Sequence, residues 1–209
     1  MTDKDLAREF AKAVGGTLAH VTAAENIDLI EATGLQPAAT LAQRAGVELE
    51  ASGIRRDRLI IGGARLNHQR PILHGLTAAH RMLDGHSPES WARQLDARVF
   101  FWPRSRLARF KASIDRDLDT ATILVDAETL ALNLMDHIDL CAINSGNFTQ
   151  GGSSVRRGDW IYRPMREGLG SFRRYRMRRG LVKRPDTIGE VSLRCAVSPS
   201  LLTACLVYP

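Results

Sequence analysis

The sequence contains few cysteines and no long apolar run. Its three cysteines, Cys141, Cys195 and Cys205, are odd in number, and their spacing fits neither a disulfide framework nor a zinc site. No stretch approaches the roughly 20 consecutive apolar residues that a membrane span requires. The first residues, MTDKDL, are charged and lack the apolar segment of a secretory signal. We therefore expect a protein of the reducing cytoplasm, with no membrane contact and no metal site.

The composition is that of a globular protein with a core of its own. Of the 209 residues, 44% are hydrophobic and 25% are charged. A chain of this length suits a single domain, so we expect one domain over residues 1–209.

Positive charge is concentrated in one segment. The chain carries a net charge of +6, but residues 156–184 hold eleven basic and two acidic residues, a local excess of +9. Such a field attracts polyanions, and we expect nucleic acid as a partner. The alternative is a solvated basic face without a specific partner.

Hydrophobic periodicity predicts a mixed α and β fold. A helix over 3–14 precedes a strand over 17–22 and a second helix over 24–33, which Gly34 ends. Residues 36–96 are expected to form two or three helices, an insertion or lid, and residues 144–186 to be mostly loop. Further strands are predicted over 98–102, 121–125, 138–143 and 187–194, helices over 105–115 and 127–135, and a last strand or short helix plus strand over 201–207. The fold class is therefore α+β.

Two constellations could bind a flat amide-bearing ligand. His20 and Thr22 alternate with Val21 along a strand, and Asn26 follows in the next helix. The second is Phe100-Phe101-Trp102-Pro103-Arg104, in which an aromatic side chain can stack on a ring and the arginine can clamp a pyrophosphate. A structural histidine and an ordinary core strand are the alternative readings.

Glu190 is the candidate catalytic carboxylate. It lies in the otherwise apolar strand Ile188-Gly189-Glu190-Val191-Ser192-Leu193, where a charge is costly unless it faces solvent or has a function. A carboxylate can stabilise the positive charge that develops on a ribose when its bond to nicotinamide breaks, and it can deprotonate the attacking group. An outward-facing glutamate on an edge strand is the alternative.

These motifs, in this order, resemble the DarT-type DNA ADP-ribosyltransferases. His20-x-Thr22-x-x-x-Asn26 with Ile30 and Gly34-Leu35 is similar to the first motif of that family, and Phe100-Phe101-Trp102-Pro103-Arg104-Ser105 to the second. Gly189-Glu190-Val191-Ser192-Leu193, with Val197-Ser198-Pro199 and Val207-Tyr208 after it, is similar to the third.

The resemblance implies a fold, a cofactor and residue roles. The fold would be a split β-sheet core with a helical insertion after the first strand-helix unit, and NAD would be the co-substrate. His20, Thr22, Asn26 and either Phe101 or Trp102 would bind NAD, while Arg104 and Glu190 would be catalytic. The segment 144–186 would be the substrate loop, binding single-stranded DNA or RNA through Arg156, Arg157, Trp160, Tyr162, Arg173 and Tyr175. A bacterial toxin or defence effector with an antitoxin partner is the implied setting.

Other activities remain open from the sequence. ADP-ribose could pass to a protein or to water, or the reaction could be RNA 2′-phosphate transfer, which also uses NAD. The chain could instead be a non-enzymatic nucleic-acid-binding module, or a catalytically dead scaffold of the same fold. Within 36–96, His68, Arg70 and His74 could line the site or could only cap and join helices.

Overall fold

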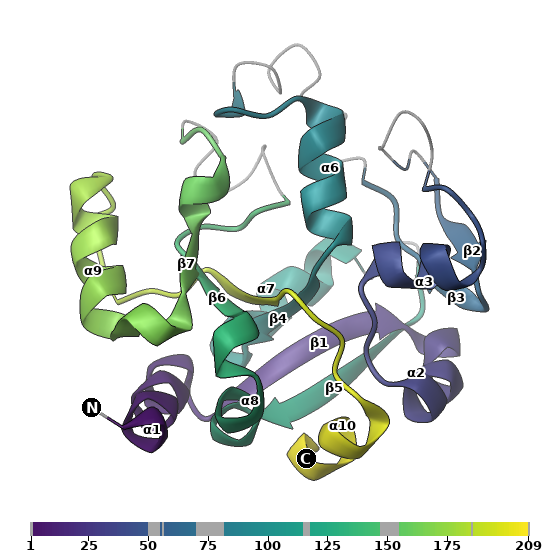
Figure 1. Ribbon diagram of the computed structural model, residues 1–209, viewed down its shortest axis with the longest axis horizontal. Helices are drawn as coiled ribbons and strands as arrows, with labels where there is room; N and C mark the ends of the chain where they lie inside the picture. Colours follow the sequence, from purple (N-terminus) through teal and green to yellow (C-terminus); the bar gives the residue numbers. More distant parts are fainter. Residues whose placement is uncertain are drawn as a thin grey trace.

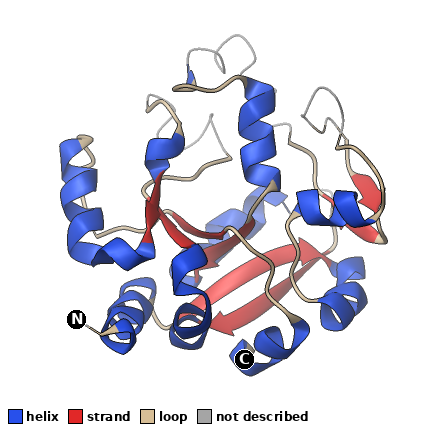
Figure 2. Cartoon of the chain, viewed as in Figure 1, coloured by secondary structure: helices blue, strands red, loops and turns tan. Residues whose placement is uncertain are grey.

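The computed structural model describes residues 2–49, 55, 57–69, 82–114, 118–146, 155–184 and 186–208. A six-stranded sheet runs through its centre with helices around it (Figures 1 and 2), so the α+β class is confirmed. Each pair of neighbouring strands in this sheet is antiparallel. The strand order is β5 (Thr120–Asp126), β1 (Thr17–Ala23), β4 (Val99–Pro103), β8 (Glu190–Leu193), β6 (Ile138–Cys141) and β7 (Tyr162–Pro164).

One face of the sheet carries the main core. Helix α1 (Asp3–Val14) starts at a capping box between Thr2 and Asp5 and buries Leu6, Phe10 and Val14, one face at helical spacing. It packs against α8 (Ala127–Leu134), which Asp126 caps by accepting a hydrogen bond from the backbone N–H of Thr129. The helix α10 (Pro199–Cys205) lies beside α8 and buries Leu202 and Cys205.

Strand β1 pairs with its two neighbouring strands over different lengths. It pairs with β5 along all seven residues, from Thr17 opposite Asp126 to Ala23 opposite Thr120. With β4 it pairs only at Leu18 and Ala19. The sheet therefore opens between the second half of β1 and the first half of β4, and this opening positions the candidate site.

The segment 36–96 contains a hairpin in addition to the predicted helices. Helix α2 (Ile27–Thr33) follows a 3-10 turn, η1 (Ala24–Asn26), and leads to α3 (Ala38–Arg44). A hairpin then forms from β2 (Leu59–Ile61) and β3 (Ala64–Leu66), before α6 (Pro88–Asp96). Gly62 and Gly63 both have positive φ, 56° and 83°, as a two-residue hairpin turn requires. The two described helices of this segment, α3 and α6, agree with the prediction, but the hairpin was not predicted because the glycine pair was taken for a break between helices.

The segment 144–186 is also more ordered than the predicted loop. Its described residues form η3 (Asp159–Ile161), β7, η4 (Met165–Glu167) and α9 (Gly168–Arg178). Helix α9 buries Phe172 and Arg176, and the Arg176 guanidinium donates to the carbonyl of Ala142. Because Arg176 occupies a buried position of the helix, the apolar residues of α9 do not recur at helical spacing, and the sequence did not predict the helix.

The other predicted elements lie close to their expected positions. Helix α7 (Arg104–Ile114) follows β4, and η2 (Met135–His137) follows α8. At the C-terminal end the short helix α10 forms, and Leu206 makes an isolated bridge with Val125. Among the described residues, no helix is long and apolar enough to cross a membrane, and no group of His, Cys, Asp and Glu is arranged to hold a metal ion.

Candidate functional site

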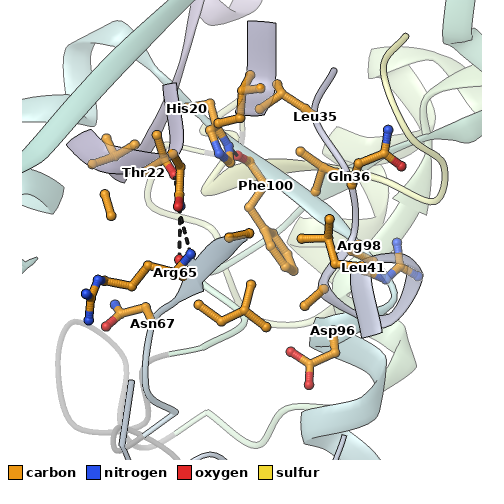
Figure 3. A pocket seen from close by; sticks show the side chains of 18 of the residues that line it. His20, Thr22, Leu35, Gln36, Leu41, Arg65, Asn67, Asp96, Arg98 and Phe100 are labelled. Atoms are coloured by element: carbon orange, nitrogen blue, oxygen red, sulfur yellow. Dashed lines mark hydrogen bonds between the residues drawn. The ribbon is translucent and has the colours of Figure 1, made fainter. Parts of the chain in front are cut away.

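A cavity of about 300 Å³ lies where β1 and β4 diverge. One wall comes from the second half of β1 and from η1 and α2, and another from Phe100 and Trp102 of β4. The hairpin strand β3, α3 and the last turn of α6 close the remaining sides (Figure 3). Most of the lining is apolar, from side chains such as Ile30, Leu35 and Leu41.

His20 is held as a neutral side chain beside this cavity. Burial lowers its pKa, against a smaller opposing effect of its bond to the backbone of Phe100. The Nδ1 atom lies 2.9 Å from the carbonyl oxygen of Phe100. A carbonyl oxygen can only accept, so Nδ1 carries the proton and the neutral ring keeps Nε2 as an acceptor. The His20 ring also contacts Phe101, with ring centroids 5.7 Å apart.

Asn26 joins the hairpin to β1. Its side-chain amide donates to Thr22 Oγ1 at 2.9 Å and to the carbonyl of Arg65 at 3.0 Å, and it accepts from the backbone N–H of Arg65 at 2.7 Å. Both amide hydrogens and the oxygen of this buried side chain are therefore used. Asn26 shapes the wall of the cavity by fixing β3 against the end of β1.

Gly34 and Leu35 fix the next part of the wall. Gly34 has φ +78°, and a Cβ at this position would overlap the carbonyl oxygen of Val197. Leu35 and Val197 exchange two backbone hydrogen bonds of 3.0 and 2.9 Å. Glycine is required because the backbone is both left-handed in φ and in direct contact with the neighbouring chain.

Two cavity residues have buried polar atoms without a hydrogen-bond partner in the described structure. One is Oε1 of Gln36, whose Nε2 donates to the carbonyl of Thr33 at 2.7 Å. The other is Nε1 of Trp102, whose ring stacks on Phe110 with centroids 3.5 Å apart. Such atoms are costly when buried, so an acceptor and a donor are both available to a ligand.

At the end of the cavity next to α6, the charges of Arg55 and Asp96 neutralise each other. Arg55 Nη1 donates to Asp96 Oδ2 at 2.6 Å, and Gln69 Nε2 donates to Asp96 Oδ1 at 3.0 Å. Burial raises the pKa of Asp96, and the hydrogen bond and charge of Arg55 oppose that shift. This cluster holds the segment around Arg55 and Gln69 against α6, and His68 lines the cavity beside it.

Glu190 is buried in the adjacent part of the sheet, only 2% exposed. Its Oε1 accepts a hydrogen bond of 2.9 Å from the backbone N–H of Ser145. Burial raises its pKa to about 7, against the opposing effects of the Ser145 hydrogen bonds, of Cys141 and of the nearby Arg157 charge. Arg157 is 1% exposed, and burial lowers its pKa to about 10.

The turn at Asn144–Ser145 is contacted by three buried side chains, those of Glu190, Arg157 and Trp91. Arg157 Nε lies 3.4 Å from the carbonyl of Asn144, and Trp91 Nε1 donates to the carbonyl of Ser145 at 3.1 Å. The carboxylate therefore contributes to the structure of this turn. Glu190 does not line the cavity.

A second buried polar row lies next to Glu190 on the same face. Arg98 Nη1 donates to Asp139 Oδ2 at 2.5 Å and to Ser192 Oγ at 3.0 Å. The Arg98 guanidinium also lies 3.9 Å from the ring centre of Tyr162, and burial raises the pKa of that phenol. Strand β8 is buried on both faces because this row covers one of them.

The residues of the first two motifs are largely brought together. His20, Thr22, Asn26 and Trp102 all line the cavity, whereas Phe101 points into the main core and Arg104 lies exposed at the start of α7. In the register of β4 with β8, Phe101 faces Val191, so Trp102 and Glu190 occupy the next positions along the two neighbouring strands, although Glu190 does not line the cavity. Arg70 and His74 lie outside the described residues.

The residues of the expected substrate loop do not form one group. Arg157 and Tyr162 are buried, and Arg156 donates to the carbonyl of Leu83 at 2.6 Å. The other three, Trp160, Arg173 and Tyr175, lie on or beside α9.

Some cavity residues were missed from the sequence: Gln36, Arg55, Asp96 and Phe100. Two of them carried a signal. Gln36 directly follows Gly34-Leu35, and Phe100 alternates with Trp102 and so shares its face. Arg55 and Asp96 are brought together by tertiary structure over 41 positions of sequence.

Comparison with known proteins identifies a family but no characterised relative. No curated protein matches the chain, and no solved structure matches it. A family model described as a family of unknown function, DUF7002, matches residues 16–203. That match spans most of the chain, which therefore belongs to the DUF7002 family.

Proposed function

We propose that this protein is an NAD-dependent ADP-ribosyltransferase with nucleic acid as the acceptor. The observation that carries the proposal is the cavity at the divergence of β1 and β4. It gathers His20 and Asn26 of the first motif and Trp102 of the second, and the third-motif carboxylate Glu190 follows one strand away. The resemblance of the three motifs to ADP-ribosyltransferases is what supports the proposed chemistry.

The cavity suits the nicotinamide–ribose part of NAD. About 300 Å³ is at the lower end of the range for small-molecule sites, so it accommodates one half of a dinucleotide. The unpartnered Trp102 Nε1 would donate to a carboxamide oxygen, and Gln36 Oε1 would accept from a carboxamide N–H. Nε2 of the neutral His20 would accept from a ribose hydroxyl.

In bound NAD, the bond between C1′ of the ribose and the nicotinamide nitrogen would break, and nicotinamide would leave with the bonding electron pair. The acceptor nucleophile then forms a new bond to C1′ and loses a proton. Glu190 would stabilise the positive charge that develops on the ribose and take up that proton, for which a pKa of about 7 is suited. Because the carboxylate is bound to Ser145 and is buried, the proposal requires that the turn at Asn144–Ser145 releases it when substrates bind.

The proposal is tested with NAD and four separate acceptors: single-stranded DNA, duplex DNA, RNA and a cell-protein extract. Released nicotinamide is measured by chromatography, and the gain of one ADP-ribose unit is measured by mass spectrometry. We expect wild type to release nicotinamide and to modify single-stranded nucleic acid. Glu190→Gln should lose at least about 100-fold in rate, as loss of a catalytic group does, whereas the exposed-site control Glu9→Gln should match wild type.

Two outcomes would contradict the enzyme assignment. One is the absence of nicotinamide with every acceptor while NAD does not bind by calorimetry. The other is unchanged turnover in Glu190→Gln. Transfer of ADP-ribose to the protein extract alone would support the enzyme assignment but refute nucleic acid as the acceptor.

A non-enzymatic nucleic-acid-binding module is the second candidate, favoured by the structural role of Glu190. The carboxylate supports the turn at Ser145 and does not line the cavity. That reading predicts salt-sensitive binding of nucleic acid by wild type and Glu190→Gln alike, without NAD consumption.

A further inference from the structure

A strongly basic surface, centred on α9, lies away from the cavity. In Figure 1, α9 stands at the left edge, whereas α3 and the β2–β3 hairpin, which help to enclose the cavity, stand on the right. Helix α9 packs against α1 and η4 on one side and exposes the other. The exposed arginines of this helix are therefore placed on a surface of their own, and none of them lines the cavity.

Several cations of this surface are not neutralised. Arg163 pairs with Glu167, Arg173 with Asp186, and Arg166 with Asp3 and Asp136. Five others have no carboxylate within salt-bridge distance in the part of the chain that the structure describes: Arg174, Arg178, Arg179, Lys183 and Arg184. All five are exposed, so the surface keeps a field that attracts a polyanion.

Two aromatic rings lie among these cations. Trp160 and Tyr175 have ring centroids 6.4 Å apart. The Arg179 guanidinium is 4.9 Å from the Trp160 ring centre and 5.6 Å from that of Tyr175, and Arg163 is 4.5 Å from Tyr175. Trp160 Nε1 donates to the carbonyl of Arg156 at 3.1 Å, which fixes the ring. Half-buried rings with guanidinium groups against them can accept a base in a stacked position.

We propose that this α9 surface, formed by Trp160, Tyr175, Arg174, Arg178, Arg179, Lys183 and Arg184, is a docking site for single-stranded nucleic acid, separate from the cavity. The cations contact successive phosphates, and the two rings stack on exposed bases. An anionic membrane would match the charge but would leave the fixed rings without a role. The docking site is inferred from the α9 residues alone. Its role in holding an acceptor strand depends on the proposed function.

The test measures binding without NAD. A fluorescein-labelled oligothymidine of about 20 nucleotides is titrated with protein at several salt concentrations, and anisotropy reports the affinity. The variant replaces Arg174, Arg178 and Arg179 by Gln. The control variant replaces three exposed arginines elsewhere, Arg8, Arg44 and Arg93, by Gln, so that both lose the same charge.

We expect the α9 variant to lose about tenfold or more in affinity and its salt slope to fall by about two, because three phosphate contacts contribute roughly 0.7 each on a single strand. The control should change less than about threefold, since net charge alone acts weakly at a distance. Tyr175→Leu should weaken binding and leave the salt slope unchanged, because stacking releases no counterions.

Equal losses in the two triple variants would overturn the docking site, and so would tighter binding to phosphatidylserine vesicles than to the oligonucleotide. Binding of NAD in the absence of nucleic acid, measured by calorimetry, separates this inference from the proposed function. If the α9 variant binds both NAD and the oligonucleotide like wild type, the docking site is refuted and the enzyme assignment stands. If it loses oligonucleotide binding while neither protein binds NAD or releases nicotinamide with any acceptor, the docking site stands and the enzyme assignment is refuted.

Discussion

Replacing Glu190 by Gln should change how the stability of the protein depends on pH. In the folded protein the pKa of Glu190 is raised to about 7 from an ordinary value of 4.5, chiefly by burial. Gln keeps the shape and an oxygen that can accept from Ser145, but it cannot ionise. Any constant effect of the new amide on stability is the same at every pH, so only the pH-dependent part tests the reasoning.

The sign of the effect follows from proton binding in the two states. Between pH 4.5 and pH 7 the folded protein holds the Glu190 proton and the unfolded chain has lost it. The contribution of this group is therefore fully present below pH 4.5, decreases as the pH rises, and is lost above pH 7. A difference of about 2.5 pKa units corresponds to about 3 kcal/mol in the free energy of unfolding.

Urea denaturation of wild type and Glu190→Gln at pH 5, 6, 7 and 8 measures this quantity. Relative to wild type, the variant should gain up to about 3 kcal/mol in stability over that range, with most of the gain below pH 7. The comparison of two proteins cancels the titration of all other groups. A difference in unfolding free energy that stays constant from pH 5 to pH 8 would refute a raised pKa and a buried carboxylate at this position.

Two further substitutions test the frame around the site, both by urea denaturation at neutral pH. Gly34→Ala should lower the free energy of unfolding by about 3 kcal/mol or more, because φ is positive and the new Cβ would overlap the carbonyl of Val197. The control Gly85→Ala, with φ +75° and open space around the new Cβ, should cost only about 1 kcal/mol. Equal costs in the two variants would contradict the close approach of Gly34 to Val197. Arg98→Met should cost about 2 kcal/mol, because it removes a charged hydrogen bond from Asp139, which is 3% exposed and keeps only its 3.3 Å ion pair with Arg194. No loss of stability would contradict a contribution of this pair to the buried polar row.

Local patterns in the sequence were sufficient for most elements and for part of the site. Leu6, Phe10 and Val14 recur at helical spacing, and they form the buried face of α1 as expected. The strand and helix around His20 and Asn26 were also predicted, and both residues line one cavity with Trp102. These features depend on neighbours within a few positions, so periodicity and turn residues carry enough information.

Only the tertiary structure decided which face each strand residue presents and which distant segments meet. Phe101 and Trp102 are adjacent and equally aromatic, yet one enters the core and the other lines the cavity, because β4 pairs with β8 in a particular register. The basic segment looked like a loop around the site, but Arg176 is buried against Ala142 and turns α9 toward another surface. Sequence patterns report local spacing, whereas pairing register and long-range contacts are set by the packing of the whole chain.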